Sequence, residues 1–199
     1  SSDVCSSDLI QRNNLLKQIR FQNNLIETLE AWDIQLVKYG SEVIKYREKF
    51  IKHLGEVCQK IHNKLTGGKE KILLEYDRDV GYDSYLTELA KKRQKDLKYS
   101  TTTVGPHRDD ISFIVNGIDI RKYGSQGQQR TAALSLKLAQ IQLMREVMKE
   151  SPILLLDDVL SELDSNRKTY LLESIKDTQT IITCTGLDEF ISKHLPIQR

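Results

Sequence analysis

Residues 153–158 read Ile-Leu-Leu-Leu-Asp-Asp, four apolar side chains followed directly by two carboxylates. Four consecutive apolar residues predict a strand that is buried in a sheet. Carboxylates at the C-terminal end of such a strand lie where open α/β sheets bind ligands, and Mg²⁺ prefers carboxylate oxygens together with water and phosphate oxygens. The stretch therefore predicts a Walker B strand, in which Asp157 holds the metal and Asp158 orients or activates the attacking water.

The residues around this strand predict an α/β lobe. Two acids also commonly end a strand in a plain turn, so the surroundings must decide between the two interpretations. Helices that alternate with apolar strands predict a parallel sheet covered by helices. The expected elements are helices at about 127–149 and 166–175, a second apolar strand at 180–185, and a hairpin at 111–123 around Asn116-Gly117.

A glycine-containing turn, residues 125–130, opens the helix expected at 127–149 and reads Ser-Gln-Gly-Gln-Gln-Arg. Ser125 and Gln128 have the spacing of a capping box, which explains both residues by helix chemistry alone. A capping box does not explain Gly127, because glycine in the first turn costs stability relative to alanine. Glycine lets a bulky group approach the backbone, and a helix N-terminus attracts anions. The turn is therefore suited to the terminal phosphate of a nucleotide.

The first part of the chain predicts paired helices. Apolar residues recur at steps of three and four from about 10 to 39 and again from 41 to 65, with a break expected at Gly40. Two amphipathic helices with a short break favour an antiparallel pair, for which a packing unit is the simplest interpretation. Residues 1–9 are rich in Ser and Asp without this period, so we expect an artefact outside the fold.

A strand at 71–76 and a helix at 84–97 are expected next, and the end of that helix is basic. Such a cluster is usually a solvated helix face, although it is also suited to phosphate contacts. The basic residues are Lys91, Lys92, Arg93, Lys95 and Lys98.

Composition limits the classes of protein that remain. The 30 basic and 28 acidic residues give a net charge of +2, so any nucleic-acid binding must come from a local patch. Three widely spaced cysteines (Cys5, Cys58 and Cys184) fit neither a zinc knuckle nor a disulfide framework, which favours a reducing compartment. No apolar run of about 18 residues predicts a membrane span, and no signal peptide is expected.

Three stretches carry a resemblance to a known family: Thr101–Asp110 (TTTVGPHRDD), Tyr123–Thr131 (YGSQGQQRT) and Leu154–Leu171 (LLLDDVLSELDSNRKTYL). Their order and spacing resemble the RecF family of ABC-type ATPases. The resemblance implies an α/β fold, the C-terminal half of an ABC-type P-loop ATPase head with a largely helical inserted arm lobe. On that basis we expect residues 10–98 to form the arm and residues 99–199 the ATPase subdomain.

The resemblance also implies roles for individual residues, since ATP in such heads is sandwiched between two protomers. Most ABC heads have a glutamate where Asp158 stands, so the shorter side chain implies slow hydrolysis. Arg130 either supports the signature turn or reaches across the interface, and Asp164 is also suited to cap the next helix. The implied assignments are a signature facing the partner's ATP (Ser125, Gln126, Gly127, Gln128, Arg130), a metal ligand (Asp157), a catalytic residue (Asp158), a D-loop (Ser161, Asp164) and a weak switch candidate (Thr185).

A phosphate-cradling loop is expected outside this chain. No G-x-x-x-x-G-K-[ST] string occurs, and Thr66 to Glu70 lacks the upstream glycine and the hydroxyl after lysine. We therefore expect a fragment that does not hydrolyse ATP alone, within a longer, slow DNA-dependent ATPase. Strands that flank 153–156 would then be missing, which would leave apolar sheet surface exposed.

The resemblance implies a cytoplasmic protein of recombinational repair that uses ATP and Mg²⁺ and forms a homodimer with ATP. The implied partners are single-stranded, double-stranded and gapped DNA, RecR and RecO, with help to RecA loading at gaps, and no membrane. Two alternatives stay open: a non-catalytic partner-binding scaffold, and another SMC-like head. The short arm argues against the second, because SMC coiled coils are far longer. The role of Gly105–Asp110 is not explained by the residues alone.

Overall fold

The computed structural model describes residues 2–149 and 152–184, and the chain divides into two compact units. The first unit is formed by residues 1–52 and 75–112, and the second by residues 53–74 and 113–199. This division differs from the boundary expected near residue 98, which was drawn from sequence character and stays a prediction.

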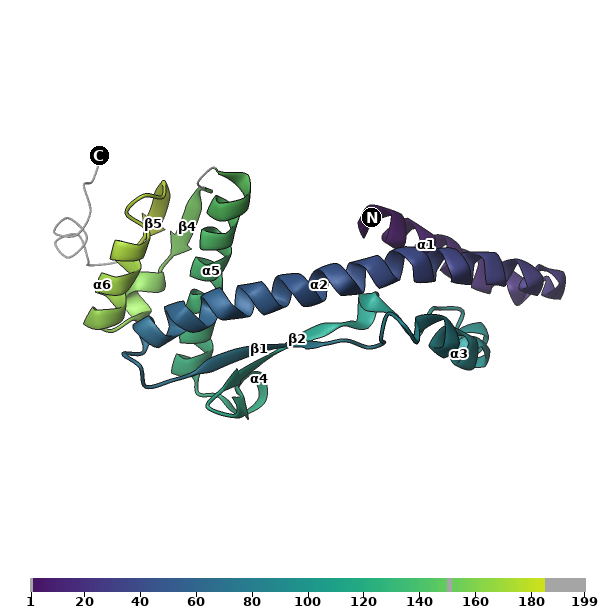
Figure 1. Cartoon of the computed structure of the whole chain (residues 1–199), viewed down its shortest axis with the longest axis horizontal. Coiled ribbons are helices and arrows are strands. Elements are labelled where there is room, and N and C mark those ends of the chain that lie inside the picture. The colour runs from purple at the N-terminus through teal and green to yellow at the C-terminus, as the bar shows by residue number, and fades with distance from the viewer. Residues whose placement is uncertain (1, 150–151, 185–199) are drawn as a thin grey trace. The chain divides into compact units, whose positions relative to one another are not determined.

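Figure 1 labels the helices and strands of the chain. They are α1 (Ser2–Ile19), η1 (Asn23–Thr28), α2 (Leu29–Leu65), β1 (Ile72–Asp77), α3 (Tyr85–Tyr99), η2 (Pro106–Arg108), β2 (Asp110–Val115), β3 (Ile118–Asp119), α4 (Ile120–Tyr123), α5 (Gln126–Met148), β4 (Leu154–Asp157), η3 (Val159–Glu162), α6 (Ser165–Ser174) and β5 (Thr180–Thr183).

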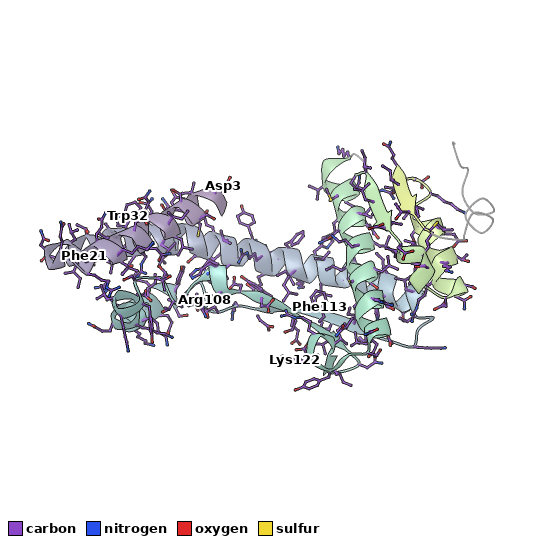
Figure 2. All side chains as sticks on the ribbon, turned by 180° about the vertical axis from the view of Figure 1, so that it is seen from behind. Asp3, Phe21, Trp32, Arg108, Phe113 and Lys122 are labelled. Atoms are coloured by element: carbon purple, nitrogen blue, oxygen red, sulfur yellow. The ribbon has the colours of Figure 1, made fainter. Side chains whose placement is uncertain are left out.

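The break between the first two long helices lies at residues 20–22, so the break expected at Gly40 is wrong. Helix α2 passes through Gly40 without interruption. A Cβ atom at this position would lie 2.7 Å from Cε1 of Tyr85, so glycine here lets Tyr85 pack against the helix. Phe21, in the break itself, is 87% exposed (Figure 2). The glycine therefore serves tertiary packing rather than helix termination.

Residues 2–9 belong to α1, so excluding them from the fold was wrong. Cys5 is buried in a core cluster with Leu36, Ile44 and Tyr85, which come from α2 and α3. The expectation that residues 1–9 originate as an artefact stays a prediction.

A buried charge cluster lies in the first unit between α1, α2 and α3. The guanidinium of Arg12 is fully buried, and its Nε lies 2.7 Å from Asp33 while Nη1 lies 2.8 Å from Asp96. The same Nη1 donates to the hydroxyl of Thr102 at 2.7 Å, and Arg93 pairs with the second oxygen of Asp33 at 2.9 Å. Both carboxylates are nearly inaccessible, at 1% and 0% exposure. These contacts join the three helices through Arg12, Asp33 and Asp96, whose charges are buried and therefore depend on one another for compensation.

The stretch Gly105–Asp110 is a structural turn of the first unit. The carboxylate of Asp109 accepts from Arg47 Nη1 at 3.0 Å, from the hydroxyl of Tyr76 and from the backbone amide of Asp79 at 3.0 Å. Burial of the phenol raises the pKa of Tyr76, and the hydrogen bond to Asp109 raises it further, while Arg47 acts in the opposite direction. The turn therefore connects α2, β1 and the segment before α3, a role that its sequence did not indicate.

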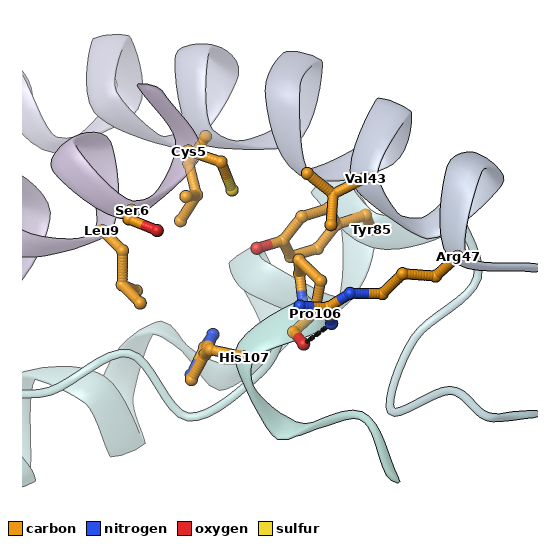
Figure 3. Close-up of a pocket in the computed structure, with 9 residues that line it drawn as sticks. Cys5, Ser6, Leu9, Val43, Arg47, Tyr85, Pro106 and His107 are labelled. Atoms are coloured by element: carbon orange, nitrogen blue, oxygen red, sulfur yellow. Dashed lines mark hydrogen bonds between the residues drawn. The ribbon is translucent and has the colours of Figure 1, made fainter. Parts of the chain in front are cut away.

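A small cavity of about 60 Å³ lies beside this turn (Figure 3). Gly105 has φ of 135°, and a Cβ atom there would lie 2.3 Å from the hydroxyl of Tyr85, so only glycine fits. The hydroxyl of Tyr85 is buried without a hydrogen-bond partner among residues 2–149 and 152–184. A cavity of this size suits a bound water rather than a nucleotide.

The hairpin of the second unit confirms the Asn-Gly turn. Asn116 and Gly117 have φ of 48° and 82°, the positive angles of a type I′ turn. Strands β2 and β3 pair antiparallel within a sheet of order β1-β2-β3. The second strand is shorter than expected, because Asp119 accepts from the amide of Arg121 and starts α4.

A two-stranded parallel sheet, β4 and β5, forms the other part of the second unit and confirms the parallel pairing. Leu154 and Leu156 are buried, whereas Ile153 and Leu155 are 61% and 69% exposed. The expectation of a strand buried on both faces is wrong, because the two described strands are covered on one face. Ile181 of β5 is also exposed, so apolar sheet surface is open as predicted. No described helix is long and apolar enough to span a membrane.

Candidate nucleotide-facing site

The turn that opens α5 forms the capping box that the sequence predicted. Ser125 is the N-cap in extended conformation, and its hydroxyl accepts from the amide of Gln128 at 3.2 Å. In return, the side-chain oxygen of Gln128 accepts from the amide of Ser125 at 3.0 Å. Ser125, Gln126 and Gly127 are exposed, so the first turn of the helix faces solvent. An exposed first turn presents backbone amides and the positive end of the helix dipole.

Gly124, just before the turn, and Gly127, within it, are explained by different features of the structure. A Cβ atom on Gly124 would lie 2.6 Å from both Cβ and the carbonyl oxygen of Ile120, so close packing requires glycine there. A Cβ atom on Gly127 would meet nothing nearer than the hydroxyl of Ser125, at 4.0 Å. Gly127 has no positive φ either. The fold therefore gives no internal reason for Gly127, which leaves close approach by an outside group as its physical explanation.

Gln128 contacts Glu70, behind which lies His62, and the sequence analysis missed both residues. Its side-chain nitrogen donates to Oε1 of Glu70 at 3.3 Å, and Oε2 of Glu70 lies 3.2 Å from Nε2 of His62. On its other side, Nδ1 of His62 lies 2.9 Å from the hydroxyl of Ser135 on α5. Burial lowers the pKa of His62, while the charge of Glu70 acts in the opposite direction. Glu70 was interpreted only as part of a helix terminus.

The two carboxylates after β4 lie at the carboxyl end of the parallel sheet. Asp157 is in register with Thr183 of β5, and the Thr183 hydroxyl donates to Oδ1 of Asp157. The amide of Asp158 donates to the Thr183 carbonyl at 3.0 Å, and the carbonyl of Asp158 accepts from the hydroxyl of Ser161 at 2.7 Å. Asp158 has φ of 51°, a left-handed conformation that concentrates at functional turns. Both carboxylates are exposed.

The position of Asp164 agrees with its expected capping role. Its carboxylate accepts from the amide of Arg167 at 3.1 Å and pairs with the Arg167 guanidinium at 3.4 Å. This places Asp164 at the start of α6, directly after the turn that contains Ser161. Thr185, the switch candidate, lies outside the described residues.

The carboxylates fit Mg²⁺ only as part of a shared coordination shell. In the part of the chain that the structure describes, no group of three His, Cys, Asp or Glu side chains could hold a metal. Mg²⁺ normally binds one or two carboxylates and takes its other ligands from water and nucleotide phosphates. Asp157 and Asp158 match that donor set, with one oxygen of Asp157 already engaged by Thr183.

The structure thus contains two groups of expected site residues with different neighbours. In the turn at Ser125, Gln128 donates a hydrogen bond to Glu70, and the side chain of Gln129 donates to the carbonyl of Ile120 at 2.8 Å. Asp157 and Asp158 are bonded to Thr183 instead. Arg130 is exposed on α5, and its assigned role in the signature stays a prediction.

No protein-family model matches the chain. Curated relatives share 56% identity over 191 residues (Agathobacter rectalis), 55% over 193 (Lachnospira eligens) and 45% over 194 (Clostridium perfringens), and each is named DNA replication and repair protein RecF. These matches cover 96%, 96% and 93% of this chain. They cover 53%, 53% and 54% of the relatives, so the chain spans about half the length of the curated relatives it matches.

Two solved structures are also similar to the chain. The recombination mediator protein RecF with ATP, described as part of the RecFOR pathway, aligns with a TM-score of 0.83 at 38% identity and covers 92% of this chain and 51% of its own. RecF with ATPrS, from the same pathway, aligns with a TM-score of 0.80 at 38% identity, over 92% and 52%. The expected fold class, an α/β ABC-type ATPase head with a largely helical arm, is confirmed by these matches.

Proposed function

We propose that this chain, which belongs to the RecF family of DNA replication and repair proteins, supplies one face of an ATP site that a second protomer completes. The exposed turn at Ser125, Gln126 and Gly127 would face the γ-phosphate of ATP held by the partner. Asp157 and Asp158 would act on ATP bound to the same protomer, together with a phosphate-cradling loop outside this chain.

The open space in front of Gly127 is the observation that carries this proposal. The fold does not require glycine there, and the surrounding first turn is exposed. A helix N-terminus with free amides binds phosphate oxygens without further charged groups. This chain has no G-x-x-x-x-G-K-[ST] string, so the phosphate must arrive with another part of the assembly.

Within that site the carboxylates have separate roles. Asp157, held by the Thr183 hydroxyl, would bind Mg²⁺ directly or through water, and Mg²⁺ would neutralise phosphate charge. Asp158 would accept a proton from, or orient, the attacking water. Ser161 fixes the backbone of Asp158, and Asp164 and Ser161 would line the dimer interface as a D-loop.

A chimera tests the proposal. This chain replaces the matching residues of full-length Agathobacter rectalis RecF, and the parent protein serves as the control. We expect the chimera to sediment as a dimer with ATP and as a monomer without it, because the turn at Ser125 requires a phosphate between protomers. An ATP-independent monomer, under conditions where the parent dimerises, would contradict the proposal.

For the whole protein we propose a cytoplasmic role in recombinational repair, with RecR and RecO as partners, gapped DNA as substrate, and RecA loading as the outcome. The relatives' printed names, which refer to DNA repair, recombination mediation and the RecFOR pathway, support this role.

The exposed face of α3 is a candidate surface for DNA. Four lysines of this helix are exposed: Lys91, Lys92, Lys95 and Lys98. The two acids of the helix offset only part of this charge, because Asp96 is buried against Arg12 while Glu88 pairs with Lys91 alone. Tyr99 is 59% exposed beneath the ammonium of Lys98, which adds a surface on which a base can stack.

Replacing these four lysines by glutamine should weaken DNA binding by the chimera and flatten its salt dependence. Each lost phosphate contact lowers the slope of log affinity against log salt by about 0.9 on duplex DNA. A variant with four Lys→Arg changes at the same positions keeps the charge and should bind like the parent chimera. If fluorescence anisotropy gives the glutamine variant the same DNA affinity and salt slope as the unchanged chimera, this helix face does not contact DNA.

A further inference from the structure

We infer that Glu70 is a positioning residue for the turn at Ser125, acting through the side-chain amide of Gln128. This inference rests on the proposed function and identifies what holds the phosphate-facing turn in place. Glu70 lies between α2 and β1, outside the helix whose first turn it controls.

The hydrogen bonds of Gln128 fix the orientation of its amide. A carboxylate oxygen only accepts, so Glu70 selects the nitrogen end of the amide, at 3.3 Å. The oxygen end is thereby turned towards the backbone amide of Ser125, which donates to it at 3.0 Å. Without Glu70, the amide of Gln128 is free to rotate away and release Ser125. The capping box would then lose one of its two reciprocal bonds.

His62 lies directly behind Glu70. The hydroxyl of Ser135 donates its single hydrogen to the carbonyl of Thr131 at 2.7 Å, so it must accept from Nδ1 of His62 at 2.9 Å. This fixes the imidazole plane and places Nε2 at 3.2 Å from Oε2 of Glu70. The side chain of His62 is 0% exposed and that of Glu70 is 19% exposed. Nε2 and Oε2 form no hydrogen bond with each other, so the buried imidazole restricts the carboxylate by filling the space behind it.

These contacts form a line from the interior of α5 back to its own N-terminus. It runs through Ser135, His62, Glu70 and Gln128 to Ser125, and every member lies in the second unit. The line fixes the orientation of the Ser125 amide and hydroxyl before a nucleotide arrives. Preorganised donors bind a phosphate more tightly than donors that must first be ordered.

The substitution Glu70→Ala in the chimera should weaken ATP-dependent dimerisation about tenfold, the typical effect of losing a hydrogen bond to a charged group. Binding of ATP to the monomer should be unchanged, because the turn acts on the partner's nucleotide. Glu70→Gln should restore dimerisation, since its amide oxygen still accepts from the side-chain nitrogen of Gln128. Glu75→Ala, an exposed glutamate on β1, is the matched control and should behave as the unchanged chimera.

Sedimentation with ATP and urea unfolding of each variant distinguish the outcomes. A dissociation constant for Glu70→Ala equal to that of the unchanged chimera would overturn the inference, as would a Glu70→Gln variant as weak as Glu70→Ala. A merely structural role would lower the stability of Glu70→Ala without changing the dimer affinity of the folded protein. If the unchanged chimera does not dimerise with ATP while the parent RecF does, both the proposed function and this inference are wrong.

Discussion

Replacing Ser125 by arginine is expected to weaken ATP-dependent dimerisation of the chimera roughly 100-fold, the effect of removing an interface hot spot. The hydroxyl of Ser125 caps α5 and faces solvent, and arginine can supply no acceptor for the amide of Gln128. The long side chain would also fill the open space in front of Gly127, where the partner's phosphate is proposed to sit. Sedimentation velocity with and without ATP measures the effect.

Two comparisons make this result specific. Ser125→Thr keeps a hydroxyl at the cap and should dimerise within a fewfold of the unchanged chimera. Binding of ATP to the Ser125→Arg monomer should be unchanged, because the monomer's own nucleotide is proposed to contact Asp157 and Asp158 instead of this turn. Equal dimerisation of the arginine variant and the unchanged chimera would reduce the turn to a helix cap and favour a partner-binding scaffold.

The substitution Arg12→Leu is expected to lower the free energy of unfolding by about 3–5 kcal/mol, the cost of breaking a buried ion pair from one side. Arg12 contacts both Asp33 and Asp96, which are nearly inaccessible to solvent. Arg93 still pairs with Asp33 in the variant, whereas Asp96 loses its only recorded ion pair among the described residues. Urea unfolding of the chimera, followed by circular dichroism, measures the change.

A double variant tests whether buried charge is the cause. Combining Arg12→Leu with Asp96→Asn removes the carboxylate that is left without a counterion, whereas Asp33 keeps Arg93, and should recover part of the lost stability. Arg20→Leu, an exposed residue just after α1, should change stability by less than about 0.5 kcal/mol. If Arg12→Leu lowers the free energy of unfolding by less than about 1 kcal/mol, the cluster does not contribute substantially to the packing of the three helices.

Features set by neighbouring residues could be predicted from the sequence. The capping box at Ser125 and the Asn116-Gly117 turn depend on local chemistry, and both are present. The parallel pairing of β4 with β5 is also present, and the strand-helix-strand pattern predicts it. The break expected at Gly40 failed because a distant side chain, Tyr85, determines that glycine. Burial of 153–156 was overestimated because burial depends on what covers the sheet, which a strand's own residues do not specify.

The residues that hold the site could not be found by spacing. Glu70 lies 58 positions before Gln128, and His62 lies 73 before Ser135, so no local period relates them. Asp109 likewise meets Arg47 across 62 positions. A single glutamate after a Thr-Gly-Gly helix end has no distinguishing sequence signal. Only the folded arrangement shows that it contacts Gln128 in the turn at Ser125.

Mixing two defective chimeras tests most directly whether the turn at Ser125 acts on the nucleotide of another protomer. Ser125→Arg leaves its own carboxylates intact, and Asp158→Asn leaves its own turn intact. We expect neither variant to hydrolyse ATP alone, whereas an equimolar mixture should recover a substantial fraction of the activity of the unchanged chimera, because each heterodimer contains one complete site. If the mixture hydrolyses ATP no faster than either variant alone, although heterodimers form, the turn does not act across the interface and the account is wrong.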